Sequence, residues 1–191
     1  ISETLDPKGG RILKDSHGYP TGILIDNAVD LISSHIPKDG LEDKKRQILK
    51  SQTFLHSLGI TSVHEPGVGA TVVSALKQLR DDGLLNIRVY AMLDDNPDLV
   101  KSFLKSGPEG GDFLQFKSVK IYFDGALGSR GAALLEPYSD DTSNMGLFLT
   151  HPDSVIAKVR EMNAAGFQAN IHCIGDRANR TALDIFEAHG H

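Results

Sequence analysis

The stretch VKIYFDGALGSRG, residues 119–131, carries the pattern from which the fold can be worked out. Apolar residues at 119, 121 and 123 alternate with a lysine, a phenol and a carboxylate, and a glycine-rich loop follows. Alternation with a period of two is typical of a strand with one apolar and one polar face. Because a buried lysine is costly unless it is paired or chemically changed, Lys120 is either solvated or points into a site.

The same stretch belongs to a regular series of predicted elements. Strands are predicted over 60–65, 86–93, 116–123 and 167–174, and helices over 41–58, 70–82, 97–107, 151–166 and 176–190. Strands that alternate with helices predict a parallel sheet. The long loop 124–150 follows the third strand, where such loops often cover an active site, so we expect a lid.

The N-terminal part of the chain does not follow this series. Residues 1–22 are rich in glycine, proline and charged residues, which predicts turns or a short hairpin. The segment GILIDNAVDLISSHI then begins as a strand and continues as a helix that Pro37 ends.

The strand faces favour a barrel over an open sheet. In 86–93 one face carries Ile87, Val89, Ala91 and Leu93, and the other carries Arg88, Tyr90 and Met92. Central strands of an open doubly wound sheet are covered on both faces and are apolar throughout. A barrel with a site at the C-terminal ends of its strands produces the alternation instead. The predicted fold class is therefore α/β, as part of a (β/α)8 TIM barrel, and an open sheet with one solvated face is the alternative.

Composition excludes several classes of partner. The 191 residues carry a formal charge of −5, so no basic footprint for nucleic acid is present, and the KKR run at 44–46 is interpreted as a solvated helix face. No apolar run is long enough for a membrane span, and no signal peptide is visible. The one cysteine, Cys173, allows no internal disulfide and suits a reducing compartment, which favours the cytoplasm.

His172 is the first candidate for chemistry. It lies near the end of its predicted strand, on the polar face with Gln168 and Asn170. Parallel α/β folds place ligands at this end, and neutral imidazole is a common metal ligand. The alternative is a hydrogen-bonded core histidine. Asp176 follows four residues later, where it can orient a water or substrate, cap the helix 176–190, or do both.

Four roles are open to Lys120. It can pair with Asp124 or another carboxylate, act as a Schiff-base or general-base lysine, or lie on an exposed face. It can also react with carbon dioxide to form a carbamate, which is an anionic oxygen ligand able to bridge two metal ions.

Longer blocks of the sequence resemble the amidohydrolase superfamily. They are VKIYFDGALGSRGAALLEPYSDD, MGLF and FQANIHCIGDRANRTALDIFE, and the opening DPKGGRILKDSHGYPTGILIDNA and GITSVHEPG are also similar. The nearest resemblance is to the amidohydrolase-3 group, which includes N-substituted formamide deformylase and YtcJ-like metal-dependent hydrolases.

The resemblance implies a metal-containing (β/α)8 barrel beside a small β-sandwich. Such a site takes an H-x-H pair from the first strand, a lysine carbamate from the fourth, one histidine each from the fifth and sixth, and an aspartate from the eighth. By motif, Lys120 matches the fourth-strand lysine and His172 the fifth-strand histidine. These two are the expected metal ligands, for one or two divalent ions, with zinc preferred.

The resemblance also implies how the chain is organised. The four predicted strands would be barrel strands two to five. The chain then resembles an internal fragment, in which 1–40 is a turn-rich segment packed on the barrel and 41–191 is a partial barrel. We interpret His189 and His191, an H-x-H pair at the end of the last helix, as solvated. With most ligands elsewhere, this stretch is expected to be inactive alone, and its unpaired sheet edges to favour self-association.

The remaining site residues follow from their places beside these ligands. Asp124 and Asp176 are the candidate catalytic or polarising carboxylates, while His64 and Arg130 are candidates for substrate binding. The predicted function is hydrolysis of a C–N, amide-like bond in a small-molecule substrate by a metal-activated water. Two alternatives remain, a Schiff-base enzyme that uses Lys120 and a non-catalytic binding domain.

Overall fold

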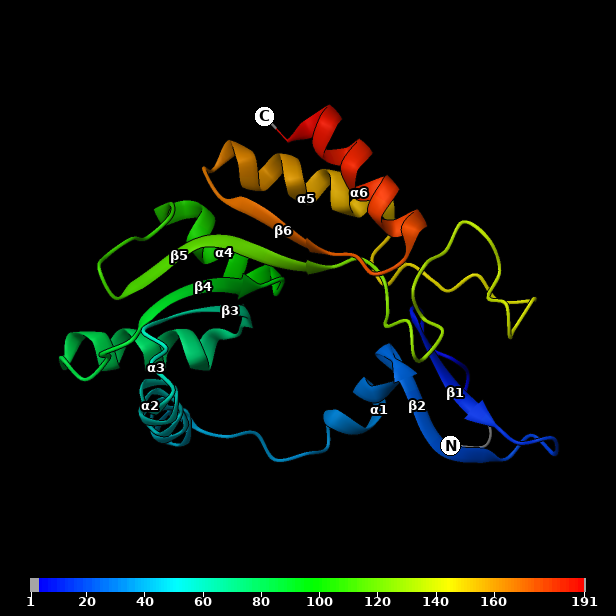
Figure 1. Cartoon of the computed structure of the whole chain (residues 1–191), viewed down its shortest axis with the longest axis horizontal. Coiled ribbons are helices and arrows are strands. Elements are labelled where there is room, and N and C mark those ends of the chain that lie inside the picture. The colour runs from blue at the N-terminus through cyan, green and yellow to red at the C-terminus, as the bar shows by residue number, and fades with distance from the viewer. Residues whose placement is uncertain (1–3, 191) are drawn as a thin grey trace. The chain divides into compact units, whose positions relative to one another are not determined.

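A computed structural model describes residues 4–190, and Figure 1 labels the helices and strands in chain order. Their bounds are β1 (Gly10–Lys14), β2 (Pro20–Asp26), η1 (Asn27–Val29), α1 (Asp30–Ser33), α2 (Leu41–Ser57), β3 (Ser62–Val68), α3 (Ala70–Asp81), β4 (Arg88–Asp94), α4 (Pro97–Ser106), β5 (Leu114–Tyr122), α5 (Pro152–Ala164), β6 (Gln168–His172) and α6 (Asp176–His189). None of the helices in this part of the chain has the length and apolar composition that crossing a bilayer requires.

The chain divides into two compact units that do not follow its order. One unit holds the chain up to Pro37, Tyr122–Ala157 and the residues from Ile171 onward, and the other holds Lys38–Ile121 with Lys158–Asn170. The predicted division near residue 40 concerns the domains of the whole protein and stays a prediction. His191 lies outside the described residues, and His189, the last residue of α6, is half-buried.

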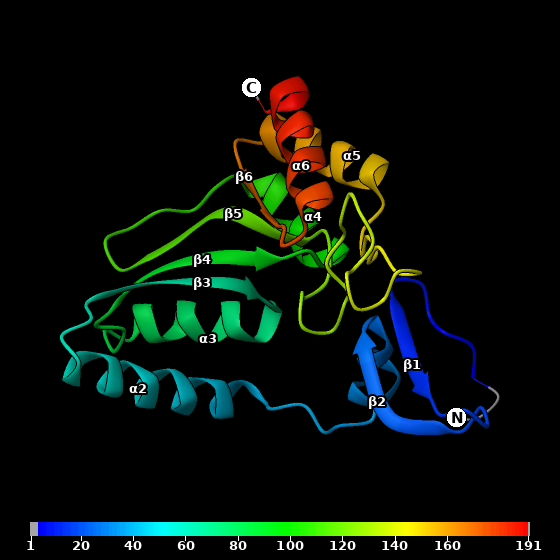
Figure 2. The ribbon, with the colours of Figure 1, turned by 45° about the vertical axis from the view of Figure 1, so that its right-hand side comes forward.

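The unit around 38–121 is built on a four-stranded sheet in the order β3-β4-β5-β6. The β3–β4 and β4–β5 pairs are parallel, as predicted from the alternation of strands and helices. This confirms the α/β class, and the repeat is consistent with part of a TIM barrel. In Figures 1 and 2, α3 runs alongside β3 and α2 lies next to α3.

The apolar faces of the strands form the core of this unit. Alternate residues of β4 and the turn before it are buried, as predicted: Ile87, Val89, Ala91 and Leu93. The helix α3 contributes Val73, Leu76 and Leu79, which are three residues apart and share one helix face. Buried Gln52 of α2 has satisfied polar groups, since its Oε1 accepts the N–H of Asn86 at 2.7 Å and its Nε2 donates to the carbonyl of Leu84 at 3.3 Å.

One irregularity in β5 changes which residues share a face. Tyr90 and Met92 of β4 are in register with Gln115 and Ser118 of β5, so β5 carries one extra residue between them. Beyond such a bulge, the residues that point to a given face of the strand are no longer an even number of positions from those before it. As a result Phe116 and Val119, three positions apart, are both buried.

The other unit begins with an antiparallel hairpin of β1 and β2, in which Gly10 is in register with Asp26. The predicted helix after it is shorter than the pattern indicated, because α1 ends at Ser33, before Pro37 is reached. The residues between Ser33 and Pro37 carry no helix, so the proline is not what ends it.

The loop between β5 and α5 is folded back on itself. The N–H groups of Leu134 and Tyr138 donate to the carbonyls of Met145 and Asn144, both at 2.9 Å. The hydroxyl of Tyr138, which is buried, donates to the carbonyl of Ala132 at 2.9 Å. These bonds give the loop a defined internal structure, and its predicted role as a lid stays a prediction.

Candidate active site

Lys120 lies near the C-terminal end of β5 and is half-buried, between the fully buried Val119 and Ile121. It is in register with Asp94 at the end of β4. Side chains of residues in register on neighbouring strands point to the same face, so Asp94 is the neighbour of Lys120 on that face. The sequence interpretation missed Asp94, because it ended the strand at Leu93, although Asp94 continues the alternation of Tyr90 and Met92.

His172 is the last residue of β6 and is half-buried. Its ring centroid lies 5.6 Å from that of Tyr122, with an angle of 46° between the rings. Its carbonyl accepts the N–H of Phe123 at 3.1 Å. The end of β6 is therefore held against the end of β5 by a backbone hydrogen bond and a ring contact.

Lys120 and His172 belong to different compact units. That they hold one ion together therefore stays a prediction.

Asp124 lies just beyond β5 and is only 1% exposed. Its carboxylate accepts three backbone N–H groups, from Ala133 at 2.9 Å, Ile174 at 2.9 Å and Gly175 at 2.8 Å. Hydrogen bonds to a charged acceptor are strong, so this carboxylate orders the turn that follows His172. It fixes the backbone next to a predicted ligand, and its role as a catalytic group stays a prediction.

Asp176 is not the N-cap that the sequence indicated. Gly175 occupies that position, and Asp176 is the first residue of α6. Its Oδ1 accepts the N–H of Leu135 and that of Arg177, both at 2.8 Å. A carboxylate in the first helical turn is favoured by the helix dipole, and this one also anchors the loop before α5. Its contribution to chemistry is still a prediction.

Arg130 forms a two-pronged ion pair with Asp140 inside the loop. Its Nε and Nη2 donate to the two carboxylate oxygens at 3.1 and 2.8 Å. The hydrogen bond with Asp140 raises the pKa of Arg130, and the same bond lowers the pKa of Asp140. The guanidinium thus braces the loop, and its predicted role in substrate binding stays a prediction.

His64 was expected at the end of its strand, but β3 runs on to Val68, so His64 lies in the middle. It is exposed, and its ring centroid is 5.1 Å from that of Tyr90. The two line a cavity of about 220 Å³ with the first residues of β3 and β4. Tyr90 is in register with Gln115, well before Lys120, so His64 and Lys120 lie in different rows of the sheet. Substrate binding by His64 stays a prediction.

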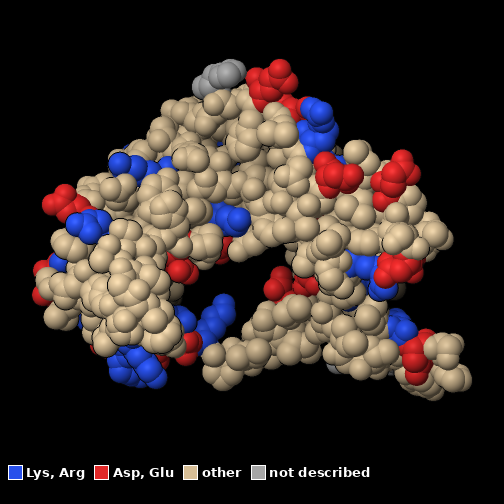
Figure 3. All heavy atoms as spheres, viewed as in Figure 1, with Lys and Arg blue, Asp and Glu red and all other residues tan. Residues whose placement is uncertain are grey.

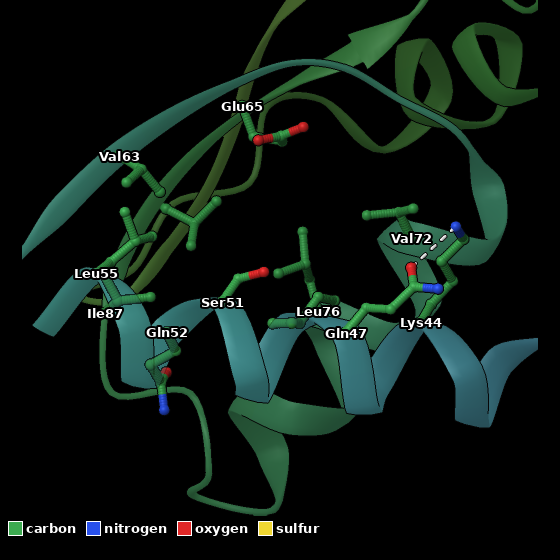
Figure 4. A pocket seen from close by; sticks show the side chains of 12 residues that line it. Lys44, Gln47, Ser51, Gln52, Leu55, Val63, Glu65, Val72, Leu76 and Ile87 are labelled. Atoms are coloured by element: carbon green, nitrogen blue, oxygen red, sulfur yellow. Dashed lines mark hydrogen bonds between the residues drawn. The ribbon is translucent and has the colours of Figure 1, made fainter. Parts of the chain in front are cut away.

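A second cavity, of about 290 Å³, lies between α2, α3 and the strands β3 and β4. In Figure 4, Glu65 and Val63 line the β3 side of this cavity, and Ser51 and Leu55 line its α2 side. Glu65 therefore projects toward the helices, while its neighbour His64 projects to the other face. Apolar side chains dominate the lining and no predicted metal ligand contributes to it, so this cavity is not the candidate site.

The residues described here do not make a complete metal site. Within 4–190, no group of three or more His, Cys, Asp or Glu side chains is arranged to hold an ion. Catalytic zinc usually takes three protein ligands. Lys120 and His172 supply at most two, so the remaining donors of a metal centre have to come from residues other than these.

The basic run of α2 that was predicted to be solvated is paired with acidic residues on and just before this helix. Lys44 bonds Asp39 at 2.8 Å, and Lys45 approaches Glu42 at 3.5 Å. On the face seen in Figure 3, lysine and arginine are interspersed with aspartate and glutamate. Charge on this face is therefore of mixed sign and forms no field of one sign.

The parallel pairing of β3, β4 and β5, with helices between the strands along the chain, is consistent with part of a TIM barrel. The chain belongs to the amidohydrolase family, whose sequence profile matches residues 2–191.

Curated relatives agree with this assignment. The chain is 30% identical to putative amidohydrolase YtcJ of Bacillus subtilis, over 97% of this chain and 36% of the relative. It is also 30% identical to protein LONG AFTER FAR-RED 3 of Arabidopsis thaliana, over 98% of this chain and 34% of that protein. The chain thus spans about a third of the length of these relatives.

Two solved structures have a similar fold. Both are described as uncharacterized metal-dependent hydrolases, from Pyrococcus horikoshii OT3 and Pyrococcus furiosus, and each superposes with a TM-score of 0.77. Their identities to this chain are 32% and 30%, over 93% of it and over 36% and 39% of those chains.

Proposed function

We propose that this chain is the central part of a barrel that hydrolyses a C–N, amide-like bond in a small molecule, with a divalent metal, preferably zinc, held in part by Lys120 and His172. Membership of the amidohydrolase family supports hydrolysis, and the solved neighbours support metal dependence. The observation that carries the proposal is the position of both residues at or near the C-terminal ends of strands of one sheet, where barrel enzymes place their sites.

The metal, when bound, would lower the pKa of a coordinated water so that hydroxide is available near neutral pH. The residues of this chain would prepare its surroundings. Asp124 holds the turn after β6, which carries His172, through the N–H groups of Ile174 and Gly175. Asp176 holds the loop at Leu135, and Arg130 braces it internally through Asp140.

The state of Lys120 is part of the proposal. As a carbamate it would provide an anionic oxygen donor, whereas as an ammonium it would repel a cation. Asp94 is in register with Lys120, so an anionic carbamate would lie on the same face of the sheet as this carboxylate.

The test uses the full-length protein that contains this chain. Lys120→Ala and His172→Ala are each expected to lower the bound metal per protomer and to reduce amide hydrolysis by at least about 100-fold, since each removes a ligand. Lys117→Ala and His56→Ala replace exposed residues of the same two types and serve as matched controls. Metal content is measured by mass spectrometry and turnover with a panel of amides and esters.

Three results decide between the alternatives. Full metal content in both ligand variants would contradict the proposal. Borohydride trapping of substrate on Lys120 in a metal-free, active enzyme would establish the Schiff-base alternative. Unchanged function in both variants would establish a binding domain.

Carbamate formation is tested separately, by labelling with ¹³C-bicarbonate in the wild type and in Lys120→Ala. We also propose a cytoplasmic location from the single cysteine, which cell fractionation can check.

A further inference from the structure

Asp26 reaches a loop that is remote from it in the chain. It is the last residue of β2, and its backbone has φ of 50° and ψ of −126°. The φ lies in the region that few residues other than glycine adopt, although Asp and Asn are among the exceptions. A Cβ added at Gly125 would lie 2.6 Å from Oδ2 of Asp26, and one added at Gly131 would be closer still. The two glycines therefore form a cradle that fits this carboxyl group.

The carboxyl group in the cradle is not satisfied. Its Oδ2 is buried and has no hydrogen-bond partner among the described residues. An ionised oxygen that is buried without a partner is costly. Burial, and then the charge of Asp124, raise the pKa of Asp26.

Within residues 4–190, the charged and phenolic groups of the glycine loop do not offer Asp26 a compensating positive charge. The carboxylate of Asp124 is occupied by three backbone N–H groups. Arg130, beside Gly131, is engaged by Asp140. Tyr138, whose pKa burial raises, is a neutral phenol that donates to Ala132.

We propose that the carboxyl of Asp26 is a latch that fastens the N-terminal hairpin to the glycine loop Gly125–Gly131, and that it does so in its neutral, protonated form. Protonation removes the cost of burying a charge and the repulsion by Asp124 together. Since Gly125 directly follows Asp124, the latch holds the segment that leads out of β5. Asp26 is a positioning residue in this role and takes no part in bond cleavage.

The proposal sets the sign of a pH effect. The native pKa of Asp26 is raised above its unfolded value, about 3.9. The native state then binds the proton more tightly, so the stability due to Asp26 is present below the unfolded pKa and is lost as the pH rises through the native pKa. The amide introduced by Asp26→Asn cannot titrate, has nearly the same shape as the carboxyl group, and belongs to a residue type that tolerates the same backbone.

The experiment compares the thermal unfolding of the full-length wild type and Asp26→Asn between about pH 4.5 and pH 8, a range that begins just above the pKa of an unfolded aspartate. The variant is expected to be the more stable protein at the high end by on the order of 2–4 °C in Tm, with the difference shrinking as the pH falls. Asp30→Asn, an exposed carboxylate four residues on, is the matched control and should follow the wild type at every pH.

Hydrogen exchange gives a second readout at the loop itself. Amides of 125–149 are expected to lose protection in the wild type as the pH rises, beyond the change in intrinsic rate, and not in Asp26→Asn. Gly131→Ala should open the same amides at both ends of the pH range, because the added methyl displaces the carboxyl. If Asp26→Asn is instead destabilised equally at every pH, the group works as a charge and the latch proposal is wrong. The latch proposal is also wrong if the difference in Tm between the wild type and Asp26→Asn does not change with pH.

Discussion

The carboxylate of Asp124 accepts the backbone N–H of Gly175 at 2.8 Å, although 51 residues separate them in the chain. With the N–H groups of Ile174 and Ala133, the same carboxylate joins the end of β5, the turn after β6 and the intervening loop. A single side chain thus supplies acceptors to three backbone groups that have no regular secondary structure to satisfy them. The backbone is also crowded at Gly175, since a Cβ there would overlap the carbonyl of Ala133.

Replacing Asp124 should therefore be among the most damaging changes in the chain. Asp124→Ala leaves three backbone N–H groups without an acceptor, those of Ala133 and Gly175 buried and that of Ile174 part-buried, and we expect it to lower the free energy of unfolding by about 3 kcal/mol or more. Urea unfolding of the purified protein measures the effect. Asp184→Asn removes an exposed carboxylate on α6 that lies 3.6 Å from Arg180, and no measurable change is expected for this control. Equal stability of Asp124→Ala and the wild type would contradict the role assigned to the carboxylate.

Phe116 is expected to be the main aromatic contribution to the core of the sheet unit. It is 0% exposed, and its ring centroid lies 5.4 Å from that of Phe103 on α4. Phe116→Ala should lower the free energy of unfolding by about 3–5 kcal/mol, because it removes buried area and leaves a cavity. Phe54→Ala, at a position 64% exposed on α2, makes the same chemical change outside the core and should cost less than about 0.5 kcal/mol. Similar losses of unfolding free energy in Phe116→Ala and Phe54→Ala would contradict the role of Phe116 in the core.

The start of α4 depends on Asn96. Its side-chain oxygen accepts the N–H groups of Asp98 and Leu99, each at 3.1 Å. We expect Asn96→Ala to cost about 1 kcal/mol of stability, and Asn96→Asp to restore most of it, since aspartate caps equally well. Chemical unfolding of both variants checks this. If Asn96→Asp is as unstable as Asn96→Ala, Asn96 does not stabilise the protein as the cap of α4.

The outer edge of β3 is where we propose that the isolated chain self-associates. Within the described sheet β3 is a terminal strand, and it contains Pro66, which lacks an N–H and is tolerated at such an edge. His64→Lys puts a charge on this edge, and charges there oppose edge-to-edge pairing. Sedimentation of the 191-residue chain should show less association for this variant, while Ser74→Lys, on an exposed position of α3, should behave as the wild type. If the wild type, His64→Lys and Ser74→Lys associate equally, the self-association does not use the edge of β3.

Much of the fold could be predicted from local pattern. The strand β4 was expected over 86–93 and is observed over Arg88–Asp94, and α3 was expected over 70–82 and is observed over Ala70–Asp81. Both have strong periodicity, which reports which side chains are buried before any partner is known. The order of strands and helices predicted the parallel sheet for the same reason.

The site was predictable only in part. Lys120 and His172 stand out in the sequence because each lies on the polar face of a strand, near its C-terminal end. The pairing of Lys120 with Asp94 depends on strand register, and the bulge in β5 could not be read from alternation, because an extra residue looks locally like any other.

The sequence by itself determined the class of fold and the two residues expected to bind metal, because hydrophobic periodicity and short motifs are local properties of the chain. Only the tertiary structure decided that Asp124 binds three distant N–H groups and that Asp26 lies in a cradle of Gly125 and Gly131. The physical reason is that the hydrogen-bond partners of a carboxylate depend on distances in the folded structure and not on positions along the chain. Hydrogen bonds, burial and repulsion act over a few ångströms, and the groups they join in this protein are far apart along the chain.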